Sequence, residues 1–249
     1  MKKIAALPSM LTLGNLVCGF HAIKYSAEGQ GRFTLAAWMV LLAMLFDALD
    51  GKVARLTKVE SQFGAELDSL ADVVSFGIAP AFLVAMMASV AELQYQRLVW
   101  LCCMVYCVCT ALRLARFNVE ATLDDSSHQG FKGLPSPAAA GQVVSLVILH
   151  HYLEKTYGVV GVQQLLPTVT FFSGVLMVSQ VRYPHLVNRY LGGHHAFADV
   201  VFLAIAALLI ATIKEITLAA CFTLFTLTGV LGLARRLVTH KAEEEEPIF

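Results

Sequence analysis

The sequence predicts an all-α protein that spans a membrane several times, and its composition and its long apolar stretches carry that prediction. Apolar residues make up 57% of the 249 residues, charged residues only 14%, and the mean hydropathy is +0.68. An ordinary soluble domain is about 45–50% apolar and about 25% charged. A soluble fold of this length could not bury so much apolar surface, so we expect lipid to surround it. The net charge is zero, which gives no general case for binding nucleic acid.

Eight apolar stretches approach the roughly 20 residues that a helix needs to cross the hydrocarbon core. In chain order they lie at about 9–27, 33–55, 68–91, 97–117, 135–153, 165–181, 197–213 and 215–234. We therefore expect about eight transmembrane helices, with a tight hairpin at Lys214 and Glu215 joining the last two. The predicted organisation is a membrane core at 1–190, an additional C-terminal transmembrane hairpin at 191–236 and a polar tail at 237–249.

The distribution of positive charge predicts how these helices are oriented. With eight spans, 13 of the 18 Lys and Arg residues fall on the side of the N-terminus, and 5 fall on the other side. Loops that stay in the cytoplasm are enriched in Lys and Arg. We therefore expect an integral protein of the cell (inner) membrane with both termini in the cytoplasm.

Four aspartates gather in residues 47–72, DALDGKVARLTKVESQFGAELDSLAD. Asp47 and Asp50 are three apart near the end of the second span, and Asp68 and Asp72 are four apart near the start of the third. Each pair therefore shares a face of its helix, and the two helices run antiparallel. Four facing carboxylates repel one another unless metal compensates, and their oxygen atoms select Mg²⁺, Mn²⁺ or Ca²⁺ rather than zinc.

Small residues and one arginine accompany the aspartates. Gly51 and Ala54 continue the helix face of the first pair, and Gly64 continues that of the second, which leaves room for a ligand near the backbone. Arg55 offers a guanidinium that can hold a phosphate through two hydrogen bonds. Ionisable residues at membrane depth are costly and usually functional. The whole set predicts a site at the membrane surface in which Mg²⁺ bridges a diphosphate.

This pattern resembles that of the CDP-alcohol phosphotransferase family, D-x2-D-G-x2-A-R-x8-G-x3-D-x3-D. The chain fills each fixed position of that pattern, with Asp47, Asp50, Gly51, Ala54, Arg55, Gly64, Asp68 and Asp72. The resemblance implies a core of six transmembrane helices, commonly dimeric, with a two-metal site open to the cytoplasm. It also implies transfer of a phosphoalcohol group from a CDP-linked donor to a hydroxyl, with release of CMP. On the same grounds the four aspartates are metal ligands, Asp72 is also the general base, and the small residues with Arg55 hold the CDP moiety.

Flanking segments are similar to those of bacterial and archaeal phosphatidylserine synthases. These segments are LPSMLTLGNLVCGFHAI, DSLADVVSFGIAPA, RLARFNV and FKGLPSPAAA, which together cover roughly residues 7–142. The chain departs from many of these relatives at Pro8-Ser9, where they have Pro-Asn. The resemblance implies CDP-diacylglycerol and L-serine as substrates, two Mg²⁺ or Mn²⁺ ions as cofactors, and a homodimer.

Polar residues on the same predicted side are candidates for binding the acceptor. A serine carboxylate would suit Arg116 or Lys132, and Asn118 could contact the amine or the hydroxyl. Arg113, three residues before Arg116, and Ser136 complete this candidate set. The same cations could instead only anchor the topology.

Three alternatives to this function stay open. A different acceptor, glycerol 3-phosphate or inositol phosphate, would use the same donor chemistry. A cation or anion transporter could also use carboxylates within the membrane, although no inverted repeat is visible. An intramembrane prenyltransferase also binds diphosphate through Mg²⁺ and aspartates, but on distant helices, whereas here the four aspartates fall within 26 residues.

Two other groups of potential metal ligands receive structural interpretations. The cysteines in LCCMVYCVC lie in a continuous apolar run, and buried cysteine packs like a small hydrophobic residue. His150 and His151 fall at the end of a predicted helix, where we expect them at the membrane interface.

Overall fold

The computed structural model describes most of the chain, namely residues 6–57, 62–91, 95–123, 133–158, 161–181, 183 and 214–244. In these residues the regular secondary structure is helical, and no strand occurs. The helices in chain order are α1 (Ala6–Ala27), α2 (Phe33–Thr57), α3 (Gln62–Asp72), η1 (Val73–Ile78), α4 (Ala79–Val90), α5 (Gln96–Leu123), α6 (Ser136–Tyr157), α7 (Val162–Val178) and α10 (Lys214–Glu244). The all-α class predicted from the sequence is confirmed.

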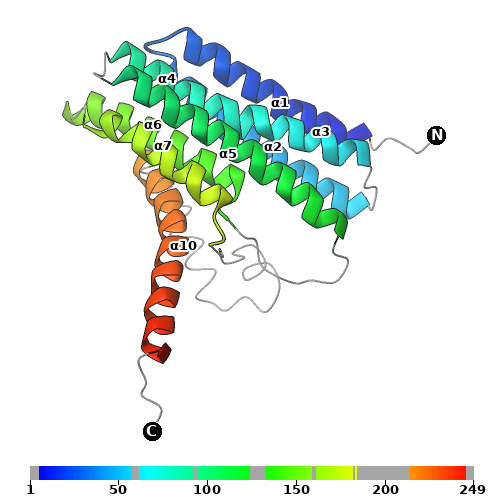
Figure 1. Ribbon diagram of the computed structural model, residues 1–249. Helices are drawn as coiled ribbons and strands as arrows, with labels where there is room; N and C mark the ends of the chain where they lie inside the picture. The colour runs from blue at the N-terminus through cyan, green and yellow to red at the C-terminus, as the bar shows by residue number, and fades with distance from the viewer. Residues whose placement is uncertain are drawn as a thin grey trace, which may run out of the picture.

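Six rods form one bundle, because α3, the π-helical segment η1 and α4 follow one another without interruption (Figure 1). Helix α1 packs against α2, α3, η1 and α4, while α5 packs against α4 and α7. Helix α6 lies against α2, α7 and α10. This arrangement agrees with the six-helix core that the family resemblance implied.

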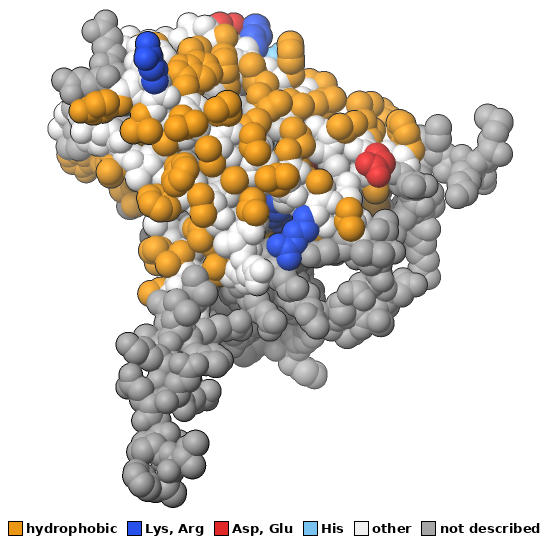
Figure 2. Space-filling model, viewed as in Figure 1, with side chains coloured by type: hydrophobic (Ala, Val, Ile, Leu, Met, Phe, Trp, Pro, Cys, Tyr) orange, Lys and Arg blue, Asp and Glu red, His pale blue; other side chains and the backbone are white. Residues whose placement is uncertain are grey.

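The outside of the bundle is apolar, which is the reverse of a soluble helical protein. Figure 2 shows apolar side chains over most of the described surface on this face, with few charges between them. Large apolar side chains on α1, α3, α5 and α7 are exposed, among them Met10, Phe20, Leu70, Met104 and Phe172. Such a surface is stable in lipid, so the structure is that of a membrane protein.

Four helical stretches of the described residues are long and apolar enough to cross a membrane. They are Phe33–Ala54, Phe63–Val90, Gln96–Val119 and Lys214–Gly232. The second of them confirms the predicted third span and joins α3, η1 and α4 into one crossing. The predicted span at 197–213 lies outside the described residues, so the total of about eight spans stays a prediction.

Small residues let the rods approach one another closely, as is common between membrane helices. A side chain on Gly19 of α1 would overlap Ser75 of η1, and one on Gly174 of α7 would come within 2.9 Å of the Tyr106 Cα on α5. Tyr106 is fully buried and donates its hydroxyl to the Phe76 carbonyl at 2.9 Å. These contacts fix η1, and therefore the end of α3 that carries Asp72, against α1 and α5.

Helix α10 begins beside α6 and then extends away from the bundle (Figure 1). The Gln142 amide donates to the Thr223 hydroxyl at 3.0 Å, and the Thr226 hydroxyl donates to the Gln142 carbonyl oxygen at 3.2 Å. Helix α10 continues to Glu244, through residues that the sequence analysis placed in the polar tail. The first arm of the predicted C-terminal hairpin lies outside the described residues.

Candidate active site

The two predicted aspartate pairs converge at one end of the bundle, which we call the aspartate end. Asp47 and Asp50 lie on α2, and Asp68 and Asp72 lie on α3. One carboxylate oxygen each of Asp47, Asp50 and Asp68 lies within 4.8 Å of the others. Spacings of three and four residues place each pair on one helix face, as the sequence predicted. The structure therefore brings together acids that are up to 25 positions apart in the chain.

Helix α1 holds one carboxylate of each pair. The Thr12 hydroxyl donates to Asp50 Oδ2 at 2.9 Å, and the Asn15 amide donates to Asp72 Oδ1 at 3.0 Å. The Ser75 hydroxyl in turn donates to the Asn15 carbonyl at 3.0 Å. All of these groups are buried, so the hydrogen bonds are shielded from water and fix both carboxylates in place.

Thr12 and Asn15 were not predicted as site residues, although the sequence contains a signal for them. They are polar residues three positions apart inside an apolar run, LTLGNL, where unpaired polar groups would be costly. One turn of helix places both side chains on the same face. That face packs against α2 and α3, which carry the aspartates.

The four carboxylates differ in exposure and in hydrogen bonding. Asp50 and Asp72 are only 6% and 7% exposed, and each accepts a hydrogen bond from α1. Asp47 and Asp68 are half-buried, and Asp68 Oδ1 has no hydrogen-bond partner among the described residues. A buried carboxylate oxygen without a partner carries a large desolvation cost, which a cation would remove. The donor set is all oxygen and anionic, so it fits hard divalent ions.

A cavity of about 330 Å³ opens beside the aspartates. Helix α3 and the end of α2 form one wall, and the C-terminal part of α5 and the start of α6 form the other. The lining residues are Asp47, Ala65, Asp68, Ser69, Asp72, Arg113, Leu114, Phe117, Asn118, Pro135, Ser136 and Pro137. Three carboxylates thus share one cavity with a single described cation, the Arg113 guanidinium.

Two hydrogen bonds order the wall opposite the carboxylates. Arg113 Nη1 donates to the Ser136 hydroxyl at 2.9 Å, while Arg113 Nε is buried and has no partner within the described residues. The Asn118 amide donates to the Ser69 hydroxyl at 3.0 Å, which ties α5 to α3. The guanidinium is therefore held from one side and keeps donor capacity for an anionic ligand.

The segment before α6 sets the position of Ser136. Gly133 has a φ of +88°, and a side chain there would overlap the Met177 carbonyl, so only glycine fits this approach. Its N–H donates to the Val181 carbonyl at 2.8 Å, and the N–H of Leu134 donates to the Leu176 carbonyl at 3.0 Å. Pro135 then precedes the first turn of α6 in an extended conformation. These contacts anchor the start of α6 to the end of α7.

The predicted CDP-binding residues follow the aspartates on the same two helices. Gly51 and Ala54 lie on α2, and Gly64 lies on α3. A Cβ added to Gly51 would meet no described atom within 4 Å, so space remains at this point of α2. Arg55 belongs to α2 through its backbone, and its side chain lies outside the described part.

The structure divides the predicted acceptor residues. Arg113, Asn118 and Ser136 line the cavity. Arg116 lies on the same helix but is not among the lining residues. Lys132 lies outside the described residues. Arg113 is thus the described cation that lines the cavity with the carboxylates.

Comparisons with known sequences find relatives that match most of this chain. A CDP-diacylglycerol–serine O-phosphatidyltransferase of Helicobacter pylori is 36% identical over 181 residues, which are 72% of this chain and 71% of that protein. The protein of the same name from Methanocaldococcus jannaschii is 34% identical over 190 residues, 76% of this chain and 79% of its own. An archaetidylserine synthase of Methanothermobacter thermautotrophicus is 35% identical over 190 residues, 74% and 73% of the two chains. The family model for CDP-alcohol phosphatidyltransferases matches residues 5–178, so this chain belongs to the CDP-alcohol phosphatidyltransferase family.

Proposed function

We propose that this protein transfers the phosphatidyl group of CDP-diacylglycerol to the hydroxyl of L-serine, giving phosphatidylserine and CMP. One observation carries the proposal: three of the four aspartates share a cavity with Arg113, Asn118 and Ser136. With divalent ions bound, the carboxylates would suit the diphosphate donor, and the opposite wall suits a small zwitterionic acceptor. Relatives that are 34–36% identical over 71–79% of the two chains carry the name CDP-diacylglycerol–serine O-phosphatidyltransferase, which supports the same reaction.

The acidic residues fit a divalent-metal site. Asp47, Asp50, Asp68 and Asp72 would hold two Mg²⁺ or Mn²⁺ ions, and the unpartnered Asp68 Oδ1 supports this assignment. Bound there, the ions would neutralise the donor diphosphate and stabilise the phosphate of the departing CMP. The hydrogen bonds from Thr12 and Asn15 keep the buried carboxylates of each pair in a fixed orientation before any ligand arrives.

Asp72 is the general base in this proposal. It lies on the cavity wall, and Asn15 engages its Oδ1, which leaves Oδ2 to accept the proton of the serine hydroxyl. The serine oxygen then forms a bond to the phosphorus next to the diacylglycerol, and the bond from that phosphorus to the bridging oxygen breaks. CMP leaves with the electron pair of the broken bond. A positioned base of this kind contributes typically about 10²–10⁴-fold to rate.

The remaining predicted residues bind the two substrates. Gly51, Ala54 and Gly64 would admit the CDP moiety close to α2 and α3, and Arg55 would pair with a phosphate. Arg113 would bind the serine carboxylate through the donors that Ser136 does not restrain. Asn118 would contact the amine or the hydroxyl. We also propose that the aspartate end faces the cytoplasm and that the protein is a homodimer.

The decisive experiment offers CDP-diacylglycerol to the purified protein together with one acceptor at a time. Serine, glycerol 3-phosphate and inositol phosphate are the acceptors to compare, and the lipid product is identified by mass spectrometry. We expect phosphatidylserine and an equal amount of CMP. A lipid product from one of the phosphorylated acceptors, with none from serine, would keep the donor chemistry and reject the acceptor. Absence of CMP release with any acceptor would reject the transferase proposal itself.

A further inference from the structure

A second group of metal-ligand side chains lies at the other end of α6. The helix starts at the aspartate cavity with Ser136, and His150 follows 14 residues later. At 1.5 Å per residue this separation is about 21 Å along the helix. His150, His151 and Glu154 therefore form a cluster remote from the transferase site. We call it the histidine cluster.

The three side chains are close enough to share one ion. One ligand atom each of His150, His151 and Glu154 lies within 4.8 Å of the others, and His150 Nε2 is 3.8 Å from Glu154 Oε2. With zinc-to-nitrogen and zinc-to-oxygen bonds of about 2.0–2.2 Å, the ligand atoms of a tetrahedral site lie about 3.4 Å apart. Rotations of the His151 and Glu154 side chains, which are not buried, would bring the three ligand atoms to this separation. The spacings of four and three residues from the two histidines bring Glu154 beside both.

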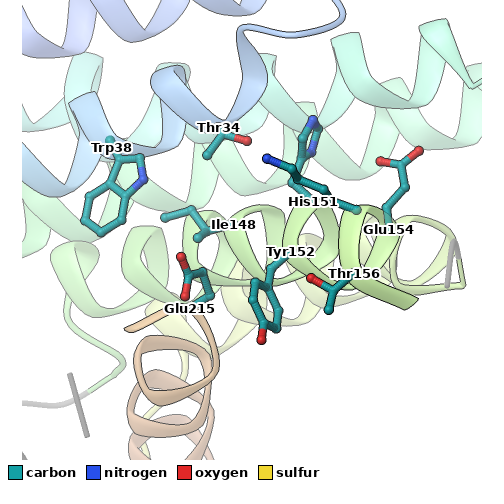
Figure 3. Close-up of a pocket in the computed structure, with 9 residues that line it drawn as sticks. Thr34, Trp38, Ile148, His151, Tyr152, Glu154, Thr156 and Glu215 are labelled. Atoms are coloured by element: carbon teal, nitrogen blue, oxygen red, sulfur yellow. The ribbon is translucent and has the colours of Figure 1, made fainter. Parts of the chain in front are cut away.

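A pocket of about 800 Å³ gives access to the cluster. It lies between α6, the start of α2 and the start of α10 (Figure 3). In Figure 3 the side chains of His151 and Glu154 project from the same side of α6, whereas Tyr152 and Thr156 point to the opposite side. Two of the three ligands thus project into the same part of the pocket, where solvent and ions can enter.

The imidazoles are incompletely satisfied within the described residues. His150 is only 2% exposed, and neither its Nδ1 nor the buried Nδ1 of His151 has a hydrogen-bond partner there. Leaving a buried polar nitrogen without a partner is unfavourable, because the nitrogen loses its hydrogen bond to water. Coordination of one nitrogen of each ring by a metal ion would offset this cost, and the charge of Glu154 would be compensated as well.

We propose that His150, His151 and Glu154 bind a divalent ion of the zinc class at the end of the bundle opposite the aspartates. Imidazole suits Zn²⁺, Ni²⁺ and Cu²⁺, whereas Mg²⁺ and Mn²⁺ prefer carboxylate, carbonyl and water oxygens. The two ends of the bundle therefore select different metals. Three protein ligands leave the fourth tetrahedral position for water or an exogenous ligand.

One cation in the same pocket opposes metal binding. Lys155 lines the pocket next to Glu154, and its ammonium group repels a divalent ion. We therefore expect the native site to bind zinc less tightly than its ligands alone would allow. Replacing this cation, as in Lys155→Gln, should tighten zinc binding, an effect that no purely structural role of the histidines would produce.

The test uses the full chain, purified in detergent with excess Mg²⁺ so that hard-metal sites are saturated. Zinc is titrated by equilibrium dialysis, and the bound ion is examined by X-ray absorption spectroscopy. We expect one zinc per chain with imidazole scattering in its spectrum. His151→Ala and Glu154→Gln should each weaken zinc binding at least tenfold. Even mutation of a residue that only hydrogen-bonds to a metal ligand lowers metal affinity about 10–100-fold.

The control removes a different adjacent pair of imidazoles, His194→Ala with His195→Ala, and should leave zinc binding unchanged. Glu154 is exposed, so we expect the Glu154→Gln variant to fold normally. Its melting temperature without zinc should therefore match that of the native protein, and weaker zinc binding in this variant would not be due to misfolding. Zinc bound through oxygen atoms alone would overturn the proposal. So would unchanged affinity in both cluster variants, or loss of the zinc only in the His194 and His195 variant.

Discussion

At the residue scale, the aspartate site depends on side chains that come from three helices. The spacing of the aspartates made their pairing predictable, because three- and four-residue separations define a helix face. Thr12 and Asn15 were not predicted, since their bonds to Asp50 and Asp72 span 38 and 57 positions of the chain. Local periodicity carries no information on which distant helix a polar side chain will meet. Only the packing of α1 against α2 and α3 supplies it.

Asp68→Asn tests the metal assignment. A neutral amide cannot replace a carboxylate ligand, so we expect turnover to fall at least about 10²-fold while the melting temperature in detergent changes little. Chelation of divalent ions should abolish the native activity, and Mg²⁺ or Mn²⁺ should restore it. The exposed neighbour Glu66 supplies the matched control, because Glu66→Gln removes the same charge two positions away. Full turnover in excess chelator would contradict the metal site.

Asn15→Leu tests whether α1 positions Asp72. Loss of a hydrogen bond to a charged group costs about 1.5–3 kcal/mol, which corresponds to roughly a ten- to hundredfold change. We expect this loss in kcat, with the KM for CDP-diacylglycerol nearly unchanged, because the substrate contacts remain. Ser26→Ala is the control, since it removes a buried hydrogen bond at the other end of α1. Equal losses of kcat from Asn15→Leu and Ser26→Ala would show that the loss reflects the stability of α1 and not the position of Asp72.

Arg113→Ala tests the acceptor site. The serine carboxylate should lose a charge-assisted bond, so the KM for serine should rise about ten- to a hundredfold while CDP binding stays nearly intact. Serine methyl ester, which lacks the carboxylate charge, should be a poor acceptor and should lose less on substitution. Arg116→Ala, on the same helix but outside the cavity lining, is the control. A larger effect at Arg116 would restore the assignment that the sequence first suggested.

At the element scale, the lengths of the helices were predictable and their interruptions were not. Apolar runs of about 20 residues located α2, the α3–η1–α4 rod and α5, because membrane thickness sets their length. The amino-acid composition of η1 does not predict its π-helical turns. Within η1, the Phe76 carbonyl accepts a hydrogen bond from the Tyr106 hydroxyl of α5. Such π segments frequently occur at functional sites, and η1 directly follows Asp72.

Gly133→Ala tests whether the segment before α6 shapes the acceptor wall. Alanine is strained at a φ of +88°, and its Cβ would overlap the Met177 carbonyl, so the start of α6 should shift. We expect a lower melting temperature and a raised KM for serine. Gly158→Ala is a matched control, because Gly158 also has positive φ but an added Cβ would meet no described atom within 4 Å. Similar effects at both positions would mean that backbone strain alone accounts for the loss.

At the scale of the whole molecule, the bundle has two chemically distinct ends. Carboxylates and the Arg113 cavity occupy one end, and the imidazoles of the histidine cluster occupy the other. The aspartate pattern within 26 residues predicted the site at the first end. At the second end, the sequence led us only to expect the two histidines at the membrane interface. The proposed function of this end depends on a pocket formed by α2, α6 and α10, which are distant in the chain.

The predicted orientation of these two ends can be tested with sealed membrane vesicles. Positive charge divides 13 to 5 in favour of the side that carries the aspartates, so the active site should face the cytoplasm. Serine is charged and does not cross a bilayer freely. Externally added serine should therefore be converted to phosphatidylserine by inside-out vesicles, and only slowly by right-side-out vesicles. Mild detergent should equalise the two preparations, which controls for the amount of enzyme. Higher activity in intact right-side-out vesicles would invert the topology and place the histidine cluster in the cytoplasm instead.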